Sequence, residues 1–205
     1  MTFEIGIIKA LQSGRNDFFD VFFGGFAYLA TVWSVLALAL LCFFFVNKKI
    51  GFAFLITEGF AYISTYALKH IIKRARPFVV NPDILNLGNE SGYSLPSGHL
   101  TCAIIITIFL FYIAFRYFKT KGRTTVGIFA SLFTLLMIVD RMYLGAHYLT
   151  DTLAGIVIGG VWCAIAFVAL PPVGKVFDSC WAKIVAKHKQ KKETKEAQKA
   201  EQSEK

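Results

Sequence analysis

The sequence predicts an all-α protein, a polytopic transmembrane helical bundle of five to six membrane helices that includes an amphipathic N-terminal helix. Two observations support this prediction. Of the 205 residues, 56% are hydrophobic and only 17% are charged, an unusual balance for a soluble protein. The apolar residues also form long uncharged blocks at 21–46, 100–115 and 152–174, and about 20 mostly apolar residues are enough to cross a membrane.

The first expected element is an amphipathic helix within residues 1–22. One helical face collects apolar side chains, those of Phe3, Ile7, Ile8 and Leu11. A helix of this kind lies in the interface between lipid and water. A short sixth membrane element is the alternative.

Five membrane spans follow this helix. The uncharged blocks and the polar residues that flank them place the spans at about 22–46, 50–72, 98–118, 124–140 and 149–171. Residues 22–174 are therefore expected to form one helical membrane domain. The Lys-rich residues 175–205 are expected to form a cytoplasmic tail.

The net charge of +9 is concentrated in clusters between the spans. Threading five spans places Lys48, Lys49, the basic residues of 116–123 and the tail on one side, which the positive-inside rule makes cytoplasmic. This distribution argues against nucleic acid as a partner and favours the membrane. No metal site is expected, because no cluster of His, Cys and Asp has metal-ligand spacing. The spacings of the four cysteines are typical of neither a disulfide framework nor a zinc site: Cys42, Cys102, Cys163 and Cys180.

Basic residues also occur on the opposite side, where the topological trend does not explain them. Lys69 and Arg76 are seven residues apart, so both project from one helical face before Pro77 ends the helix. The same face continues inward as a polar stripe that is expected to face the bundle, formed by Glu58, Tyr62 and Thr65.

Three other charged residues of this part of the chain are expected to have no role in catalysis or phosphate binding. Lys73 and Arg74 are expected to be solvated or to face lipid headgroups. A carboxylate inside a span is costly, so Glu58 is expected to be protonated or hydrogen-bonded to hydroxyl groups across the bundle. Its role is expected to be structural rather than catalytic.

Two further stretches on this side carry groups suited to phosphate chemistry. Ser97 is a candidate helix N-cap, and Gly98 lets the backbone approach a ligand closely. The N–H groups of a helix N-terminus attract anions, and His99 follows directly. His147 and Asp151 are four residues apart, which suits a carboxylate that orients an imidazole. Close helix packing beside this pair is predicted by the small residues Gly155 and Gly159.

Three stretches resemble the signature motifs of the type-2 phosphatidic acid phosphatase family. They read KHIIKRARP at Lys69–Pro77, PSGH at Pro96–His99 and RMYLGAHYLTD at Arg141–Asp151. All three occur in the family's order and spacing, which makes the resemblance specific. The family is the membrane branch of a superfamily that also includes soluble acid phosphatases and vanadium haloperoxidases. One position departs from the pattern, since Asp140 stands where Ser usually precedes the Arg of the third motif.

The resemblance implies an integral membrane phosphatase that acts on a lipid-anchored phosphate or diphosphate without a metal or cofactor. The threading of the spans places this site outside the cell or in the periplasm. The candidate substrates within the family are undecaprenyl diphosphate, phosphatidylglycerophosphate, phosphatidic acid and lipid A phosphates. A non-catalytic phospholipid-binding protein or a lipid-phosphate transporter is the alternative.

The resemblance also implies a role for each motif residue. His147 would attack phosphorus to form a phosphohistidine, Asp151 would orient His147, and His99 would protonate the leaving oxygen. The implied phosphate-binding residues are Lys69, Arg76, Ser97, Gly98 and Arg141.

Overall fold

The computed structural model of the chain describes residues 2–169, 186 and 190. These residues form helices and loops and no strand, which confirms the all-α prediction. The predicted Lys-rich tail at 175–205 lies outside the described residues, apart from 186 and 190. Residue contacts divide the chain into units at Met1–Ala166 and Phe167–Lys205, and the site and the cavity described below lie in the first unit.

The N-terminal segment forms two helices rather than the single one expected within residues 1–22. Helix α1 spans Thr2–Ser13, and α2 spans Asp17–Phe26, beginning where the Asn16 side chain accepts a hydrogen bond from the backbone N–H of Phe19. The buried face of α1 also differs from the expected one, because Glu4 and Ile8 are buried whereas Phe3 is 74% exposed. With twelve residues α1 is about 18 Å long, too short to cross a membrane.

The first predicted span, at 22–46, is a bent pair of helical segments. Asp17–Ala30 comprises α2 and the 3₁₀ turn η1 (Ala27–Ala30), and Val32–Val46 comprises α3 (Val32–Leu41) and the π turn η2 (Cys42–Val46). The two segments meet at 54°. The break occurs at Thr31, whose backbone is extended and whose hydroxyl donates to the Tyr28 carbonyl at 3.1 Å while capping α3. Such side-chain hydrogen bonds compete with the helical ladder.

The remaining spans agree with their predicted positions within a few residues. They are α4 (Lys48–Ile72), α6 (Gly98–Tyr117), α7 (Thr120–Tyr143) and a last helix at Leu149–Ala169, and the short α5 (Pro77–Val80) follows α4. Among the described residues, four helices are long and apolar enough to cross a membrane, or five if the bent pair counts as one span. The predicted multi-pass bundle is therefore confirmed.

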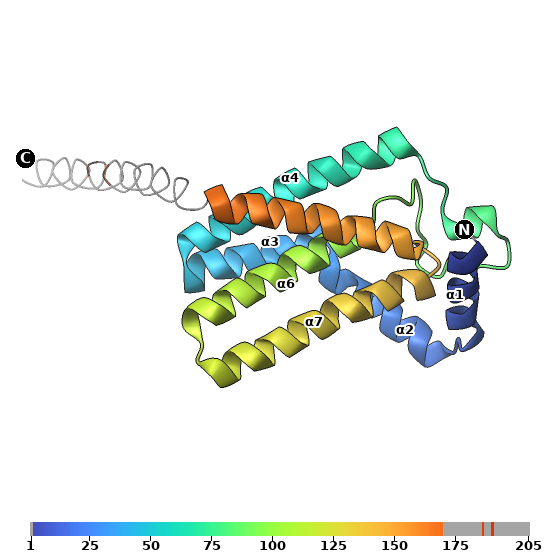
Figure 1. The fold of residues 1–205 in the computed structure, drawn as a ribbon, viewed down its shortest axis with the longest axis horizontal. Helices are drawn as coiled ribbons and strands as arrows, with labels where there is room; N and C mark the ends of the chain where they lie inside the picture. The colour runs from blue at the N-terminus through green and yellow to red at the C-terminus, as the bar shows by residue number, and fades with distance from the viewer. Residues whose placement is uncertain (1, 170–185, 187–189, 191–205) are drawn as a thin grey trace, which may run out of the picture. The chain divides into compact units, whose positions relative to one another are not determined.

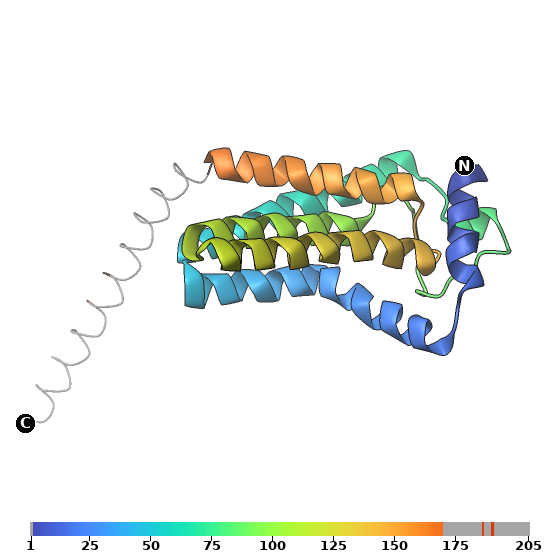
Figure 2. The same cartoon turned by 60° about the horizontal axis from the view of Figure 1, so that its bottom comes forward.

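The long helices lie side by side, and α1 lies across one end of the bundle (Figures 1 and 2). This is the end where α4 and α7 finish and where α6 and the last helix begin. Helix α1 is fixed there by a hydrophobic cluster in which Ile8 packs with Ile84, Met142 and Tyr148. The three sequence motifs consequently meet at one end of the bundle, called the site end below.

Two glycines let the last helix approach α6 closely, as the sequence predicts. A Cβ atom added at Gly155 would lie 2.4 Å from the carbonyl oxygen of Ser97, and one at Gly159 would lie 2.4 Å from Ile104 Cγ2. Both distances are too short for any real contact. Close packing at Gly155 therefore sets the position of Ser97 relative to the last helix.

Replacing Gly155 by Ala is expected to lower the free energy of unfolding by about 1–3 kcal/mol, because the new methyl group would overlap backbone. The matched control is Gly160→Ala, since a Cβ there meets no described atom within 4 Å. Both changes raise helix propensity equally, so their difference isolates the packing effect. Thermal unfolding in detergent measures this difference, and equal stability of the two variants would contradict the packing role.

Candidate active site

The end of α4 and the loop behind it carry two cations. Lys69 lies in the last turn of α4, where its Nζ donates hydrogen bonds to the carbonyl oxygens of Tyr93 at 2.7 Å and Ser94 at 3.3 Å. Arg76 is 4% exposed and donates from Nη1 to the Ala146 carbonyl at 2.8 Å. Both cations therefore hold loop segments that are distant in the sequence.

Arg141, the third cation, lies between two carboxylates in the last turn of α7. Its Nε donates to Asp140 Oδ2 at 2.6 Å, and its Nη1 donates to Glu90 Oε1 at 3.0 Å. The other oxygen of Glu90 pairs with Arg76 Nη2 at 3.1 Å. Asp140, which departs from the family pattern, is thus paired with a cation. Glu90 bridges two guanidinium groups, so these groups are arranged around one anionic position.

The N-terminus of α6 adds backbone donors to the site. Ser97 caps the helix with its side chain, and its own N–H donates to the carbonyl of Asp151 at 3.0 Å. Gly98 and His99 are the first residues of the helix, and both ring nitrogens of His99 lie 3.4 Å from Arg141 Nη1. The free N–H groups and the dipole of such a helix terminus attract anions.

His147 and Asp151 face each other at the start of the last helix. Nδ1 of His147 lies 3.6 Å from Oδ2 of Asp151, which is longer than a hydrogen bond. The Ser94 hydroxyl contacts both groups, since it donates to Oδ2 and lies 3.4 Å from Nδ1. Oδ2 also accepts from the backbone N–H of Tyr148 at 2.9 Å. Ser94 therefore links the two residues that the sequence paired directly.

Arg74 supplies positive charge beside Asp151. Its Nη1 donates to Asp151 Oδ1 and to Thr150 Oγ1, both at 2.6 Å, and its Nη2 donates to Glu4 Oε2 at 3.2 Å. The guanidinium carbon also lies 4.0 Å from the centroid of the Tyr148 ring. The expectation that Arg74 is solvated or faces headgroups is wrong, because its side chain holds a buried carboxylate.

Glu4 extends this network to α1. Its Oε1 accepts from the backbone N–H and the hydroxyl of Thr150, both at 2.8 Å. Burial raises the pKa of Glu4, but the hydrogen bonds from Thr150 and the charge of Arg74 outweigh burial and lower the pKa below its ordinary value. Glu4 is therefore ionised at neutral pH and ties α1 to the site.

Burial keeps the imidazole of His147 neutral. The side chain is 2% exposed, and this loss of water lowers the pKa of His147 to about 4. The charges of Arg76 and Lys69 act in the same direction, whereas the Asp151 carboxylate opposes them. A neutral imidazole keeps a nitrogen lone pair, which a nucleophile or a base requires.

The polar stripe of α4 faces the bundle at two of its three positions. Glu58 and Thr65 are buried as expected, whereas Tyr62 is 53% exposed. Glu58 accepts a hydrogen bond from the thiol of Cys102 at 3.2 Å, so its partner across the bundle is a thiol rather than a hydroxyl group.

The site residues nominated by the sequence meet at the site end of the bundle. Three cations and a helix N-terminus can hold an anion there, next to a neutral imidazole backed by a carboxylate. No group of three or more potential metal ligands occurs among the described residues. The structure adds four residues that sequence reasoning did not place in the site, namely Glu4, Arg74, Glu90 and Ser94.

The part of the chain that carries the three motifs matches a known protein family. The family model of the PAP2 superfamily matches residues 48–174. Phosphatidylglycerophosphatase B of Bacillus subtilis (strain 168) is 32% identical over 119 residues, which are 57% of this chain and 56% of that protein. An undecaprenyl-diphosphatase of Sulfolobus acidocaldarius is 29% identical over 139 residues, 67% of this chain and 63% of that protein. The chain thus spans less than two thirds of the length of these relatives.

Two solved structures share the fold. LpxE from Aquifex aeolicus, at 23% identity, superposes with a TM-score of 0.67 over 79% of this chain and 93% of the other. A transmembrane PAP2 type phosphatidylglycerolphosphate phosphatase from Bacillus subtilis, at 26% identity, superposes with a TM-score of 0.70 over 85% of both chains.

Replacing Arg74 by Gln is expected to lower the free energy of unfolding by about 1–3 kcal/mol, because it removes the cation that balances the buried Asp151. The matched control is Lys73→Gln, since Lys73 is exposed and adjacent. Thermal unfolding in detergent compares the two variants. If both variants are as stable as the unchanged protein, Arg74 does not stabilise Asp151.

His147 is expected to remain neutral when the pH is lowered from 7.5 to 5, because burial holds its pKa at about 4. Nitrogen NMR of histidine-labelled protein in detergent follows the imidazole, and a His147→Gln sample assigns its signals. Since the folded-state pKa lies below the ordinary value of 6.5, protonation opposes folding, and stability should decrease as the pH falls below 6.5. A titration midpoint at or above 6.5 would show that burial does not control this group.

Proposed function

The chain belongs to the PAP2 superfamily, and from this premise we propose that it is an integral membrane phosphatase acting on a lipid-anchored phosphate or diphosphate. Phosphate release would proceed through a phosphohistidine intermediate. The proposed substrates are phosphatidylglycerophosphate, undecaprenyl diphosphate and phosphatidic acid, and the names of the Bacillus and Sulfolobus relatives support the first two.

One observation carries the proposal: three cations, a helix N-terminus and a buried His–Asp pair converge on the site end. Glu90 supports it, because this carboxylate accepts from both Arg76 and Arg141. A phosphate group placed between the same guanidinium groups would receive the same donors. Arg side chains suit this task because their planar fork matches phosphate oxygens.

In the proposed reaction His147 attacks the phosphorus atom in line with the leaving oxygen. A nitrogen–phosphorus bond forms as the phosphorus–oxygen bond breaks, and His99 donates a proton to the leaving lipid oxygen. Water then attacks the phosphohistidine, which releases inorganic phosphate and restores the free imidazole. His99 accepts a proton from that water, so the site returns to its starting state.

Asp151 supports this chemistry by holding His147 in place. The carboxylate accepts from Arg74, from Ser94 and from the backbone N–H of Tyr148, so its position is fixed before a substrate binds. A fixed carboxylate stabilises the positive charge that develops on the imidazole as the new bond forms.

The proposed chemistry uses no metal, since the three cations and the α6 N-terminus can stabilise the charge on the transferring phosphoryl group. We also propose that the site faces outside the cell or the periplasm. The support is the distribution of charge, because Lys48, Lys49 and the basic residues of 116–123 lie at the opposite end of the bundle from the site.

The alternative is a protein that binds or transports a phosphorylated lipid without cleaving it. Asp140 is the feature that favours it, because a carboxylate beside a phosphate site repels the substrate unless a cation balances it. Arg141 Nη2 lies 2.5 Å from Asp140 Oδ2, and this pairing weakens the alternative.

Replacing His147 by Ala is expected to reduce phosphate release by about 1,000-fold or more, because the attacking nitrogen is lost. Release of inorganic phosphate is measured in detergent with a metal chelator present, from each of the three proposed lipids. The matched control is His70→Ala, since His70 is exposed in the last turn of α4 and its Nδ1 contacts the Tyr66 carbonyl.

Two outcomes would count against the proposal. Release at the unchanged rate by a folded His147→Ala protein would remove His147 from the mechanism. A folded unchanged protein that releases no phosphate from any of the lipids would favour the binding or transport alternative.

A further inference from the structure

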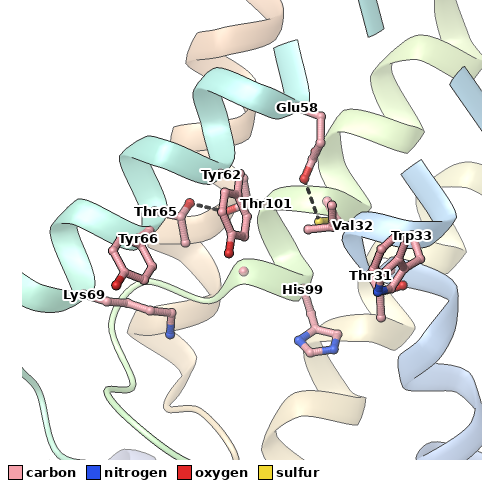
Figure 3. Close-up of a pocket in the computed structure, with 13 residues that line it drawn as sticks. Thr31, Val32, Trp33, Glu58, Tyr62, Thr65, Tyr66, Lys69, His99 and Thr101 are labelled. Carbon is pink, nitrogen blue, oxygen red and sulfur yellow. Dashed lines mark hydrogen bonds between the residues drawn. The ribbon is translucent and has the colours of Figure 1, made fainter. Parts of the chain in front are cut away.

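A cavity of about 420 Å³ extends from the candidate active site into the membrane-spanning part of the bundle (Figure 3). Its walls come from α4, from the first turns of α6 and from the bend around Thr31. Lys69 and His99 lie at one end of the cavity, and Glu58 lies at the other. A lipid whose phosphate is held at Lys69 and His99 would therefore extend toward Glu58.

Glu58 is a buried carboxyl group with an unused hydrogen-bonding atom. Its side chain is 3% exposed, and its Oε1 accepts from the Cys102 thiol at 3.2 Å. No described residue forms a hydrogen bond with its Oε2. Buried polar groups are rarely left in this state, so a ligand group is the natural partner for Oε2.

The position of Glu58 inside a membrane span determines which ligand group it can bind. An ionised carboxylate inside a span would need a cation beside it, and its hydrogen-bond partner in the structure is a thiol. The neutral carboxylic acid instead carries an O–H group that can donate one hydrogen bond. The complementary ligand group is an acceptor oxygen, such as the carbonyl of an ester.

The walls between the two ends of the cavity are mainly apolar and carry a few hydroxyl groups. Thr65 of α4 and Thr101 of α6 both line the cavity, and their hydroxyl oxygens lie 3.4 Å apart. Tyr62 and Tyr66 line it as well. The Thr101 hydroxyl already donates to the Ser97 carbonyl at 3.0 Å, so these walls discriminate little between a hydrocarbon chain and a ligand with oxygen atoms, and the selection rests on Glu58.

Helix geometry gives the spacing between the two ends. Glu58 precedes Lys69 by eleven residues within α4, which corresponds to about 16 Å along the helix axis. Because both side chains reach into the cavity, a phosphate at the site and a group at Glu58 would be roughly 10–15 Å apart.

The three candidate lipid phosphates differ in which chemical group lies at this distance from the phosphate. In phosphatidylglycerophosphate eleven bonds separate the terminal phosphorus from an ester carbonyl carbon, roughly 14 Å when extended. In phosphatidic acid five bonds separate them, roughly 6 Å. Undecaprenyl diphosphate carries only hydrocarbon beyond its diphosphate.

We propose that Glu58 forms a membrane-buried subsite whose carboxylic acid donates a hydrogen bond to an ester carbonyl of a diacyl glycerolipid. The ester lies one phosphoglycerol unit beyond the phosphate that is cleaved. This inference rests on the proposed function and names its substrate class. The subsite selects lipids of this length over phosphatidic acid and over prenyl diphosphates.

The first test compares phosphatidylglycerophosphate with its ether-linked analogue, which has the same length but lacks the carbonyl groups. The purified full-length protein should cleave the ester-linked lipid with a kcat/KM about tenfold higher, the effect of one buried hydrogen bond. The difference should appear mainly in KM, because the contact lies far from the reacting phosphate. This comparison needs no variant, so it is independent of any folding defect.

The second test changes Glu58 itself. Glu58→Leu should reduce kcat/KM for the ester-linked lipid about tenfold and leave cleavage of the ether-linked lipid and of undecaprenyl diphosphate unchanged. Glu58→Gln should retain the ester preference, because its amide N–H₂ group still donates. The matched control is Thr57→Val, since Thr57 is buried next to Glu58 but donates to the Ala53 carbonyl within its own helix.

Each other outcome overturns the inference. Equal cleavage of ester-linked and ether-linked lipids by the unchanged protein would show that no carbonyl is recognised. An equal loss on all substrates in Glu58→Leu would assign Glu58 a structural role only. Absence of phosphate release from every lipid would overturn the proposed function and this inference together, whereas the first two outcomes leave the proposed function intact.

Discussion

The burial of Asp151 is the constraint on which the site end of the bundle depends. An ionised carboxylate without exposure to water is stable only when charge and hydrogen bonds balance it. Asp151 meets this condition through Arg74 from the loop after α4, Ser94 from the loop before α6 and the backbone N–H of Tyr148. Its own carbonyl accepts from Ser97, at the start of α6. Asp151 therefore fixes two chain segments relative to the last helix, the one after α4 and the one that runs from Ser94 into α6.

Acidic and basic side chains around Asp151 are also paired with one another. Arg74 also pairs with Glu4 of α1, so a helix too short to span a membrane becomes part of the support of the site. On the other side of the site, Glu90 pairs with Arg76 and Arg141, and Asp140 pairs with Arg141. Acidic groups thus neutralise the cations when no phosphate is bound. In the proposed function, a phosphate that replaced Glu90 would keep this balance, so the same cations would be stable both with and without substrate.

The position of the site at one end of the bundle follows from the helix termini. Free backbone N–H groups occur only where a helix begins, as at the start of α6, and the dipoles of α4 and α7 favour cations near the C-terminal ends of these helices. The cavity that leads from this end toward Glu58 lies within the membrane-spanning part. A reacting phosphate at the site and a lipid body in the cavity can therefore belong to one molecule.

The sequence by itself determined the class of fold, the approximate spans and the set of motif residues. These features depend on local properties, namely the length of apolar blocks, helical spacing and short motifs. Sequence reasoning missed the break at Thr31. A continuous apolar segment is compatible with one straight helix or with two helices that meet at a bend, and the apolar pattern does not distinguish the two. Sequence reasoning also missed Glu4, and it assigned Arg74 to solvent or headgroups.

Only the tertiary structure decided these points. Glu4 and Thr150 are 146 residues apart in the chain, and Arg74 and Asp151 are 77 residues apart. A charged residue near a helix end is equally compatible with solvent, headgroups or a buried partner until the other segments are in place. The partner was set by the close packing of α6 against Gly155 and by the position of α1 across the bundle. Buried electrostatic pairing is a property of packing, and for that reason the sequence pattern could nominate the candidate catalytic groups but not the groups that hold them in place.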